Sequence, residues 1–296
     1  MQKKFLKRLT ANKILVSDGA TGTNLQEVGL LAGVTPETWV MEQPQKIIDL
    51  EKAFVEAGSD IILTCTFGAT SLRLKESRYQ SKVRELNQMA VELAKSAASG
   101  HPDVIIAGSM GPVGGLIKPY GLLELEEVAD AYLEQAIALT EAGVDVLVVE
   151  TQFSLDEAKS AVSAAKQAGD LPIVISFSYD MGLRTMMGVK PDQVVATFLP
   201  MGVAAIGANC GKTLENMEEI IKNYSSAAPE TPLWAKPNAG LPELNDQGET
   251  FFRISPKEVG EAALCYIHAG ARIVGGCCGN TPEHIAEISS RVKELL

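Results

Sequence analysis

The sequence predicts an α/β protein folded as a single (β/α)8 TIM barrel, and three observations lead to that fold class. Eight short apolar runs, rich in β-branched residues, alternate with stretches whose apolar residues recur at helical spacing. The runs are continuously apolar, as in strands buried on both faces of a parallel sheet. Eight such units in 296 residues suit one closed barrel, whose typical length is ~250 residues. An open doubly wound sheet is the alternative architecture.

The expected elements follow in order along the chain. The strands are expected within residues 14–20, 60–67, 104–112, 144–151, 171–179, 204–210, 232–238 and 271–279. The helices are expected at residues 44–57, 82–98, 125–142, 155–167, 214–225, 256–269 and 282–296. Gly58, Gly143 and Gly270 each follow a helical stretch, where glycine favours a helix C-terminus, and Thr281-Pro282 is typical of a helix start. No linker or low-complexity tract divides the chain, so residues 1–296 are expected to form one domain.

Composition excludes several classes of partner. The chain has 37 acidic and 26 basic residues, a net charge of -11, and lacks the positive field that binding to nucleic acid requires. No apolar run approaches the ~20 residues of a membrane span, and the charged N-terminal segment is unlike a signal peptide. Five cysteines are too few for a disulfide scaffold and leave at least one unpaired. We therefore expect a cytoplasmic protein without nucleic-acid or membrane partners.

Polar residues gather at one end of the expected strands, whose interiors are Ile, Val, Leu and Ala. In a (β/α)8 barrel the catalytic groups come from the C-terminal ends of the strands. A simpler interpretation is that polar residues begin wherever strands stop, but this does not readily explain three cysteines and a glutamate at one rim. The candidate rim residues are Asp18, Thr66, Glu150, Cys210, Asn238, Cys277 and Cys278.

Three of these residues are thiols, and their placement indicates a metal centre. Cys210 ends the sixth expected strand, whereas Cys277 and Cys278 end the eighth, within a glycine-rich segment that can turn both thiols inward. Thiolates favour zinc, and three protein ligands with one open position are typical of a catalytic zinc. A vicinal disulfide and three unrelated buried cysteines are the alternatives. Cys65 and Cys265 are expected to be ordinary buried cysteines.

The loop after the first strand is a candidate anion site. Its residues Asp18, Gly19, Ala20, Thr21, Gly22 and Thr23 form a glycine-rich turn whose backbone N–H groups can face an anion, although a purely structural turn has the same composition. It lacks the lysine of a nucleotide-binding P-loop. His101, His268 and His284 lie away from the strand ends and are expected to be ordinary surface or helix residues.

Several motifs together resemble the homocysteine S-methyltransferase family, and most closely the homocysteine-binding module of cobalamin-dependent methionine synthases. The matching segments span nearly the whole chain: DGATGTNL at 18–25, TCTFGA at 64–69, GSMGP at 108–112, ET at 150–151, GANC at 207–210, KPNAG at 236–240 and GGCCGNTPEHI at 275–285. Betaine-using members of the family have a tyrosine where this sequence has Gly68. That departure favours the cobalamin-linked subgroup.

The resemblance implies a role for each candidate residue. Cys210, Cys277 and Cys278 correspond to the zinc ligands of the family. Asp18 and Glu150 correspond to groups that hold the ammonium of homocysteine, and the amides of residues 20–23 correspond to those that hold its carboxylate. Asn238 corresponds to a residue that approaches the zinc when substrate is absent.

The resemblance also implies the reaction, which is zinc-dependent methyl transfer to the thiol of homocysteine to give methionine. A thiol with a reference pKa near ~8.5 is mostly protonated at neutral pH, and a metal removes that proton. The chain lacks the D-x-H-x-x-G loop that holds cobalamin, so methylcobalamin is expected from a corrinoid protein or a missing domain. Loops 108–121 and 241–248 are expected to shape its docking surface. S-methylmethionine or S-adenosylmethionine is the alternative methyl donor. An alternative function of another class is a non-catalytic zinc- or thiol-binding protein.

Overall fold

The protein is a parallel (β/α)8 barrel, as the sequence predicts. The computed structural model describes residues 4–11, 14–75, 77–244 and 250–295. In this part of the chain, eight parallel strands pair side by side in the order β1 (Leu15–Val16), β10 (Ala271–Val274), β7 (Leu233–Pro237), β6 (Ala205–Cys210), β5 (Ile173–Phe177), β4 (Val146–Gln152), β3 (Ile105–Met110) and β2 (Ile61–Leu63). A parallel bridge between Ser17 and Ile61 joins β1 to β2 and closes the ring.

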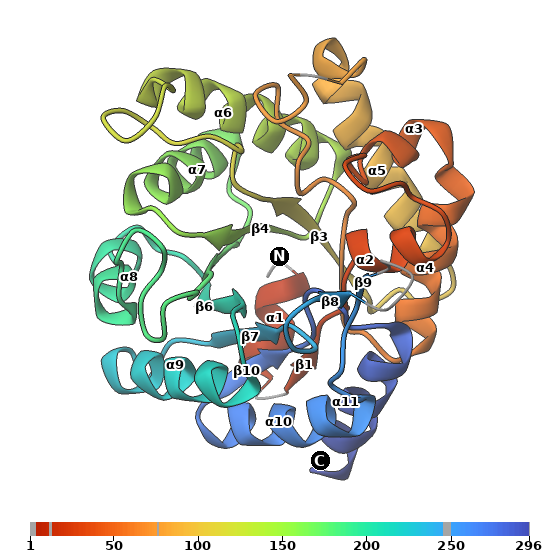
Figure 1. Cartoon of the computed structure of the whole chain (residues 1–296), viewed down its shortest axis with the longest axis vertical. Coiled ribbons are helices and arrows are strands. Elements are labelled where there is room, and N and C mark those ends of the chain that lie inside the picture. The colour runs from red at the N-terminus through yellow and green to blue at the C-terminus, as the bar shows by residue number, and fades with distance from the viewer. Residues whose placement is uncertain (1–3, 12–13, 76, 245–249, 296) are drawn as a thin grey trace.

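The helices surround this ring of strands (Figure 1). They are α1 (Lys4–Thr10), α2 (Gly22–Glu27), α3 (Thr38–Glu42), α4 (Pro44–Glu56), α5 (Val83–Ala97), α6 (Leu125–Ala142), α7 (Leu155–Ala168), α8 (Pro191–Phe198), α9 (Leu214–Ala227), α10 (Pro256–His268) and α11 (Pro282–Glu294), with a short 3-10 turn η1 (Gln80–Lys82). All the helices expected from the sequence are present, with ends within two residues of the predicted ones. Among the described residues, no helix is both long and apolar enough to cross a membrane.

Two predicted helix ends are confirmed in detail. Gly143 ends α6 in the left-handed conformation, with φ of 85°, and its N–H donates to the carbonyls of Leu139 and Thr140. Thr281 precedes α11 as its N-cap, and the side chain of His284 accepts from the Thr281 backbone N–H at 3.1 Å. Local sequence therefore fixes where these helices begin and end.

The structure also holds elements that the sequence reading missed. Helices α1, α2, α3 and α8 and the antiparallel hairpin of β8 (Glu243–Leu244) and β9 (Thr250–Phe251) were not expected. All four of these helices have eight residues or fewer, too few for a clear helical period. The strands are also shorter than the apolar runs. Run 14–20, for example, contributes only Leu15–Val16 to the sheet, because the residues after β1 turn into the loop at the barrel mouth.

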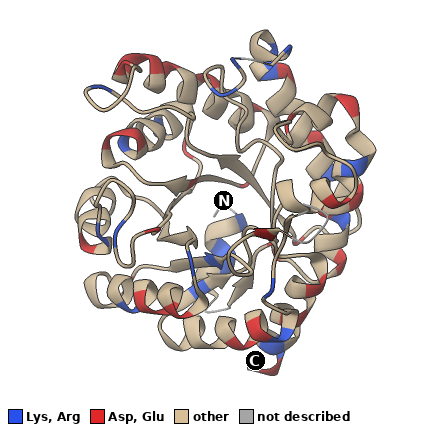
Figure 2. Ribbon diagram, viewed as in Figure 1, with Lys and Arg blue, Asp and Glu red and all other residues tan. Residues whose placement is uncertain are grey.

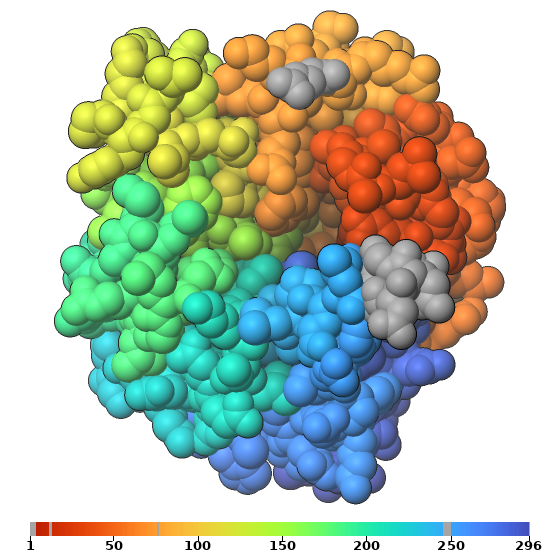
Figure 3. Space-filling model, viewed as in Figure 1, coloured from red at the N-terminus to blue at the C-terminus, as the bar shows by residue number. Residues whose placement is uncertain are grey.

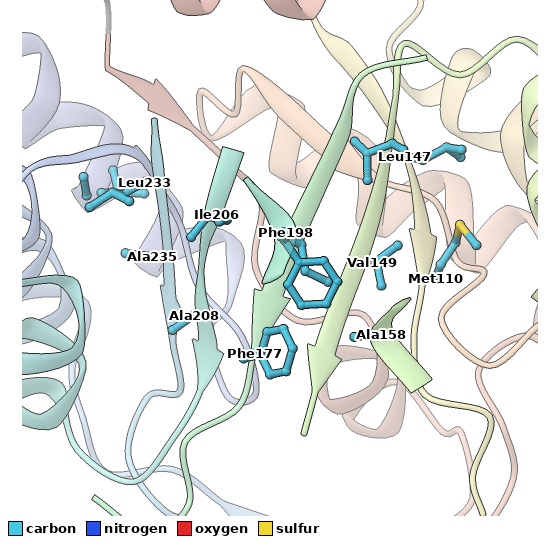
Figure 4. Close-up of a cluster of buried hydrophobic side chains, with 14 of the residues drawn as sticks. Met110, Leu147, Val149, Ala158, Phe177, Phe198, Ile206, Ala208, Leu233 and Ala235 are labelled. Atoms are coloured by element: carbon cyan, nitrogen blue, oxygen red, sulfur yellow. The ribbon is translucent and has the colours of Figure 1, made fainter. Parts of the chain in front are cut away.

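The strands separate two apolar layers. Inside the barrel, Leu15, Ile61, Ile105, Val148 and Trp234 belong to one fully buried cluster. The residues that alternate with them point outward against the helices. Figure 4 shows part of this outer layer, in which Val149, Phe177 and Phe198 pack close to one another. Burial on both faces explains why the strands read as continuous apolar runs.

Helix α1 closes the N-terminal end of the barrel. Phe5 and Leu9 are buried among the interior residues of the strands, and Figure 1 shows α1 across the centre of the ring. Arg8 forms an ion pair with Asp60 at 2.5 Å, and Lys4 forms one with Asp145 at 3.4 Å. The opposite, C-terminal end of the strands is therefore the end that remains open for a site.

Candidate active site

A cavity of about 390 Å³ lies at the C-terminal ends of the strands. Figure 3 views the barrel from this side, and the surface is hollowed near its centre, where segments from both halves of the chain meet. The walls carry the thiols of Cys210, Cys277 and Cys278, the carboxylates of Glu37 and Glu150, and the ammonium of Lys236. The loop from Gly19 to Thr23 forms a further wall.

The three thiols converge on one point of this cavity. Cys210 ends β6, and Cys277 and Cys278 follow β10 on a loop in which Gly279 takes a φ of 77°. The Sγ atoms of all three lie within 4.8 Å of one another, and those of Cys210 and Cys277 are 3.0 Å apart. Two residues adjacent in sequence thus present their thiols to the same cavity, because they lie in a turn and not in a regular strand.

Asn209 holds the thiol cluster from behind. Its amide nitrogen lies 3.5 Å from the sulfur of Cys210 and 3.7 Å from that of Cys277, and it donates to Thr151 Oγ1 at 2.7 Å. Its amide oxygen accepts from the Thr151 backbone N–H and from Ser176. Thr151 and Cys210 both have positive φ, 59° and 60°, an unusual backbone conformation for a non-glycine residue. Strained residues of this kind cluster at functional sites.

The thiols share negative charge in a way that suits a cation. Hydrogen bonds from Cys210 and Cys277 lower the pKa of Cys278 to about 3, while hydrogen bonds with Cys277 and Cys278 raise the pKa of Cys210 well above its usual value. Negative charge on one thiol is thus stabilised by hydrogen bonds from the other two. Zn–S bonds of ~2.3 Å in tetrahedral geometry place sulfurs roughly 3.8 Å apart. The observed spacing reaches this value with shifts of less than about 1 Å, so the three thiols fit one zinc ion.

A buried charge cluster adjoins the thiols. Lys236 on β7 donates to Asp18 Oδ1 at 2.6 Å, and both side chains are about 3% exposed. Glu150 on β4 accepts from Ser109 Oγ at 2.5 Å. Burial raises the pKa of Glu150 to about 7, although the positive charge of Lys236 opposes the shift. When Glu150 is ionised, two carboxylates face one ammonium, so a ligand that carries an ammonium group would supply the missing positive charge and favour the ionised form.

A chain of buried polar groups supports Glu150 from the helix side. Thr66 Oγ1 donates to the Ser109 carbonyl at 2.7 Å, and Gln135 on α6 donates to the Thr66 carbonyl at 2.7 Å. Asn87 on α5 accepts from Gln135 at 3.3 Å and donates to the Ala69 carbonyl. Buried polar networks of this kind fix the orientation of the groups at their end.

The family model for homocysteine S-methyltransferases matches residues 15–292. The chain belongs to this family. It is 32% identical over 298 residues to methionine synthase from Mycobacterium leprae (strain TN) and 30% identical over 301 residues to that from Mycobacterium tuberculosis (strain ATCC 25618 / H37Rv). These matches cover 95% and 96% of this chain, which spans about a quarter of the length of each relative (24% and 25%).

Solved structures share the fold. The metallated form of the homocysteine methyltransferase MmuM from Escherichia coli superposes with a TM-score of 0.82 at 24% identity, over 97% of this chain and 99% of that one. A methyltransferase from Methanosarcina mazei has a TM-score of 0.63 at 13% identity, over 99% of this chain and 98% of that one. At these identities the likeness establishes the barrel alone.

Some of the predicted site residues line the cavity, and others lie behind its wall. Glu150, the three cysteines and residues 19–23 line the cavity, whereas Asp18 and Asn238 are not among its lining residues. Asp18 is held behind the wall, where it also accepts from the Leu63 backbone N–H at 2.6 Å. Asn238 bridges the two cysteine loops, accepting from the Cys278 N–H at 3.1 Å and donating to the Gly211 carbonyl at 3.0 Å.

Within the loop 19–23, the backbone N–H of Ala20 already donates to the Asn280 carbonyl at 3.1 Å. The amides of Thr21, Gly22 and Thr23 lie around the start of α2, where helical N–H groups have no carbonyl partner within the helix. They are therefore the amides of this loop with capacity for an anion. Of the two loops expected to shape a docking surface, residues 245–248 of loop 241–248 lie outside the described residues.

One expectation about the cysteines is wrong. Cys65 is buried, as expected, but Cys265 on α10 is exposed. The helical pattern around Cys265 did not distinguish a position on the outer side of the helix from one facing the strands. Conversely, the sequence reading named neither Lys236 nor Asn209 as a site residue. Both stand inside quoted motifs, KPNAG and GANC, and a lysine within an otherwise apolar strand was the signal available.

Proposed function

We propose that residues 1–296 form one homocysteine-binding domain that transfers a methyl group to the thiol of homocysteine, in a zinc-dependent reaction that gives methionine. Membership of the homocysteine S-methyltransferase family supports this activity. The single observation that carries the zinc-dependent form is the convergence of Cys210, Cys277 and Cys278 in the same cavity as the buried carboxylate of Glu150.

The thiols of Cys210, Cys277 and Cys278 would hold the zinc, and the ion would supply a Lewis acid that makes the homocysteine thiol a thiolate at neutral pH. Three thiolates donate enough negative charge to leave the substrate sulfur nucleophilic. Asn209 donates toward two of these sulfurs and so keeps them oriented. Asn238 is proposed as the oxygen that substrate sulfur displaces.

The charged groups of the cavity would orient homocysteine. Glu150 and Asp18 belong to the same charge cluster as Lys236, and the ammonium of homocysteine would supply the positive charge that this cluster lacks when Glu150 is ionised. The backbone amides of residues 20–23 would bind the carboxylate of homocysteine. Those of Thr21, Gly22 and Thr23 have no carbonyl partner within the helix.

Methylcobalamin, carried by a corrinoid protein or by a missing domain, is the proposed methyl donor. The two methionine synthases that this chain resembles are about four times its length, which leaves room in those proteins for donor-binding parts. Loops 108–121 and 241–248 would form the docking surface. S-methylmethionine or S-adenosylmethionine is the alternative donor, and a zinc- or thiol-binding protein without turnover is the alternative of another class.

Metal analysis of two matched variants tests the zinc site. We expect one zinc per chain in the wild type and loss of most of it in Cys210→Ala and Cys278→Ala, because each removes one of three thiolate ligands. Cys265→Ala is the control, since its thiol lies on the outside of α10. Equal zinc contents in the wild type and all three variants would contradict the assignment of these cysteines as zinc ligands. X-ray absorption of the wild type should show three sulfur ligands without homocysteine and four with it.

A donor screen tests the reaction. Homocysteine is supplied with a methylcobalamin-loaded corrinoid protein, free methylcobalamin, S-methylmethionine or S-adenosylmethionine, and methionine is measured. We expect the corrinoid protein to act at far lower concentration than free methylcobalamin, because docking holds the methyl group beside the acceptor. Rapid turnover with S-methylmethionine alone would transfer the assignment to the small donors, and no methionine with any donor would favour a binding protein.

Calorimetry tests ammonium recognition. Glu150→Gln should weaken homocysteine binding by about 2 to 5 kcal/mol, because it leaves the substrate ammonium without its carboxylate, while zinc content stays at one per chain. Glu134→Gln on α6, whose carboxylate points to the outside, is the control. An unchanged affinity in Glu150→Gln would exclude the carboxylate from the substrate site.

A further inference from the structure

The cavity of about 390 Å³ that contains the three thiols is the proposed acceptor pocket. A second cavity, of about 730 Å³, lies beside it and is lined by three cationic side chains, Arg73, Lys75 and Arg78. Among the residues that the structure describes, none of those lining it is Asp or Glu. The chain as a whole has a net charge of -11, so a cavity of this composition departs from the average surface. In Figure 2, blue segments mark the loop between β2 and α5 that carries these cations.

Arg73 is exposed, but its side chain packs against neighbouring loops. Its guanidinium lies over the ring of Phe67, 5.8 Å from the centroid. Gly114 and Gly68 make room for it: an added Cβ would lie 3.0 Å from Arg73 Nη1 at the first position and 3.1 Å from Arg73 Cγ at the second. Gly114 also has a φ of 86°, which favours glycine. The backbone of two separate loops is thus shaped around this side chain.

The cations of the cavity differ in how far they are neutralised. Arg78 forms an ion pair with Glu42 at 2.6 Å. For Arg73 and Lys75, no carboxylate of the described residues lies within the 4.0 Å of an ion pair. Two buried carboxylates lie near Arg73: Glu37, whose Oε1 accepts from the Gly68 N–H at 2.6 Å, and Glu157, which accepts from the Val113 N–H at 2.8 Å. The positive charge of Arg73 lowers the pKa of both but only partly offsets the burial that raises it. Arg73 and Lys75 are therefore the cations lining this cavity that have no ion-pair partner among the described residues.

The remaining walls offer hydrogen-bond donors. Thr35, Thr38 and Ser77 line the cavity, as do Gly114 and Gly115. The Thr38 hydroxyl already donates to the Thr35 carbonyl at 2.9 Å, whereas the buried Thr35 hydroxyl has no hydrogen-bond partner among the described residues. Arginine and lysine beside hydroxyl groups are the usual partners of phosphate and carboxylate oxygens. Thr35 and Arg73 line both this cavity and the acceptor pocket, so the two sites share a wall.

We propose that this cavity binds the oxyanion group of a small molecule, a phosphate or a carboxylate, beside the acceptor pocket. The anion lies against Arg73 and Lys75, and the rest of the ligand extends through the shared wall region toward the acceptor. Because Arg73 belongs to both walls, occupancy of one site changes affinity at the other, and the two effects are equal by linkage. The proposal is independent of the identity of the methyl donor.

Calorimetric titration of the zinc-loaded protein with pyrophosphate, and separately with citrate, tests the site. We expect saturable binding of at least one anion at one site per chain, and weakening by about tenfold or more in Arg73→Gln/Lys75→Gln, because two charged contacts are lost. Lys82→Gln/Arg84→Gln removes the same charge elsewhere and should stay within about twofold of the wild type. The preferred anion tells phosphate from carboxylate ligands.

Two outcomes would overturn the proposal: no saturable binding of either anion, or equal weakening in both double variants, which would indicate nonspecific attraction. Arg73 and Lys75 are both exposed, so both substitutions should leave the protein folded. Lys75→Gln alone removes one of the two cations and should weaken binding about threefold or more. A homocysteine titration at saturating anion should show an altered homocysteine affinity. An unaltered value would contradict the shared wall.

Discussion

The two ends of the barrel are built on opposite principles. At the N-terminal end, α1 fills the opening with Phe5 and Leu9, and the ion pair of Arg8 with Asp60 is partly exposed, at 24% and 25%. At the C-terminal end, the pair of Lys236 with Asp18 is about 3% exposed, and Glu150 and three thiols share its surroundings. Buried charges are costly unless they are paired and hydrogen-bonded.

The difference shows which end serves stability and which serves function. Apolar burial at the N-terminal end lowers the free energy of the folded state directly. A buried ion pair contributes little net stability, yet it is strongly destabilising when one partner is removed. We therefore interpret the buried charges at the C-terminal end as groups retained for the proposed function. Four predictions test this contrast, from the largest effect to the smallest.

Removing a cation should have unequal effects at the two ends. Lys236→Met leaves Asp18 buried without its partner and should lower the free energy of unfolding by about 3 to 5 kcal/mol. Arg8→Met removes a partly exposed partner and should lower it by about 1 kcal/mol or less. Urea unfolding followed by circular dichroism measures both. Equal losses would contradict the contrast between the ends.

Truncation of the apolar plug should affect stability alone. Phe5→Ala opens a cavity at the bottom of the barrel and should lower the free energy of unfolding by about 3 kcal/mol. Zinc content and homocysteine affinity of the folded variant should match the wild type, because α1 lies at the other end from the thiols. Reduced zinc content in folded protein would show that the two ends are coupled.

The pH dependence of the free energy of unfolding should reveal the raised pKa of Glu150. Its pKa is about 7 in the folded protein, above the reference value of 4.5, so the folded state holds this proton more tightly than the unfolded state. The stability that protonation provides is complete below pH 4.5 and is lost as the pH rises through 7. Relative to Glu150→Gln, the metal-free wild type should lose about 2 to 3 kcal/mol between pH 5 and pH 8. Parallel pH profiles would contradict the raised pKa.

Removal of the amide that lies behind the thiols should have the smallest effect of the four changes. Asn209→Ala removes the amide that donates toward Cys210 and Cys277 but leaves all three ligands. Zinc affinity, measured by competition with a chromophoric chelator, should fall about ten- to hundredfold, as for other groups that orient metal ligands. Asn223→Ala, on the outer side of α9, is the control, and its zinc affinity should equal that of the wild type. An equal affinity in Asn209→Ala would leave Asn209 with a purely structural role.

Local sequence patterns were enough to predict the class of fold, most helix ends and the thiols of the site. These features depend on local patterns: continuous apolar runs, glycine and proline at helix ends, and the motifs GANC and GGCCG. These patterns did not predict α1 or α8, because a helix of seven or eight residues has too few turns for its period to be recognised, and packing against the barrel stabilises it instead.

The pairing of the charged groups could not be predicted from the sequence, because it depends on how distant segments come together in the folded barrel. Lys236 and Asp18 are 218 residues apart, and Asn209 and Cys277 are 68 apart, so no local pattern links them. Closing the ring of strands brings β1, β4, β6, β7 and β10 to one cavity and sets which carboxylate is neutralised by Lys236 and which stays available to a ligand. Residue identity supplies the chemistry of each group, but burial and distance, which arise only on folding, set its charge and its partner.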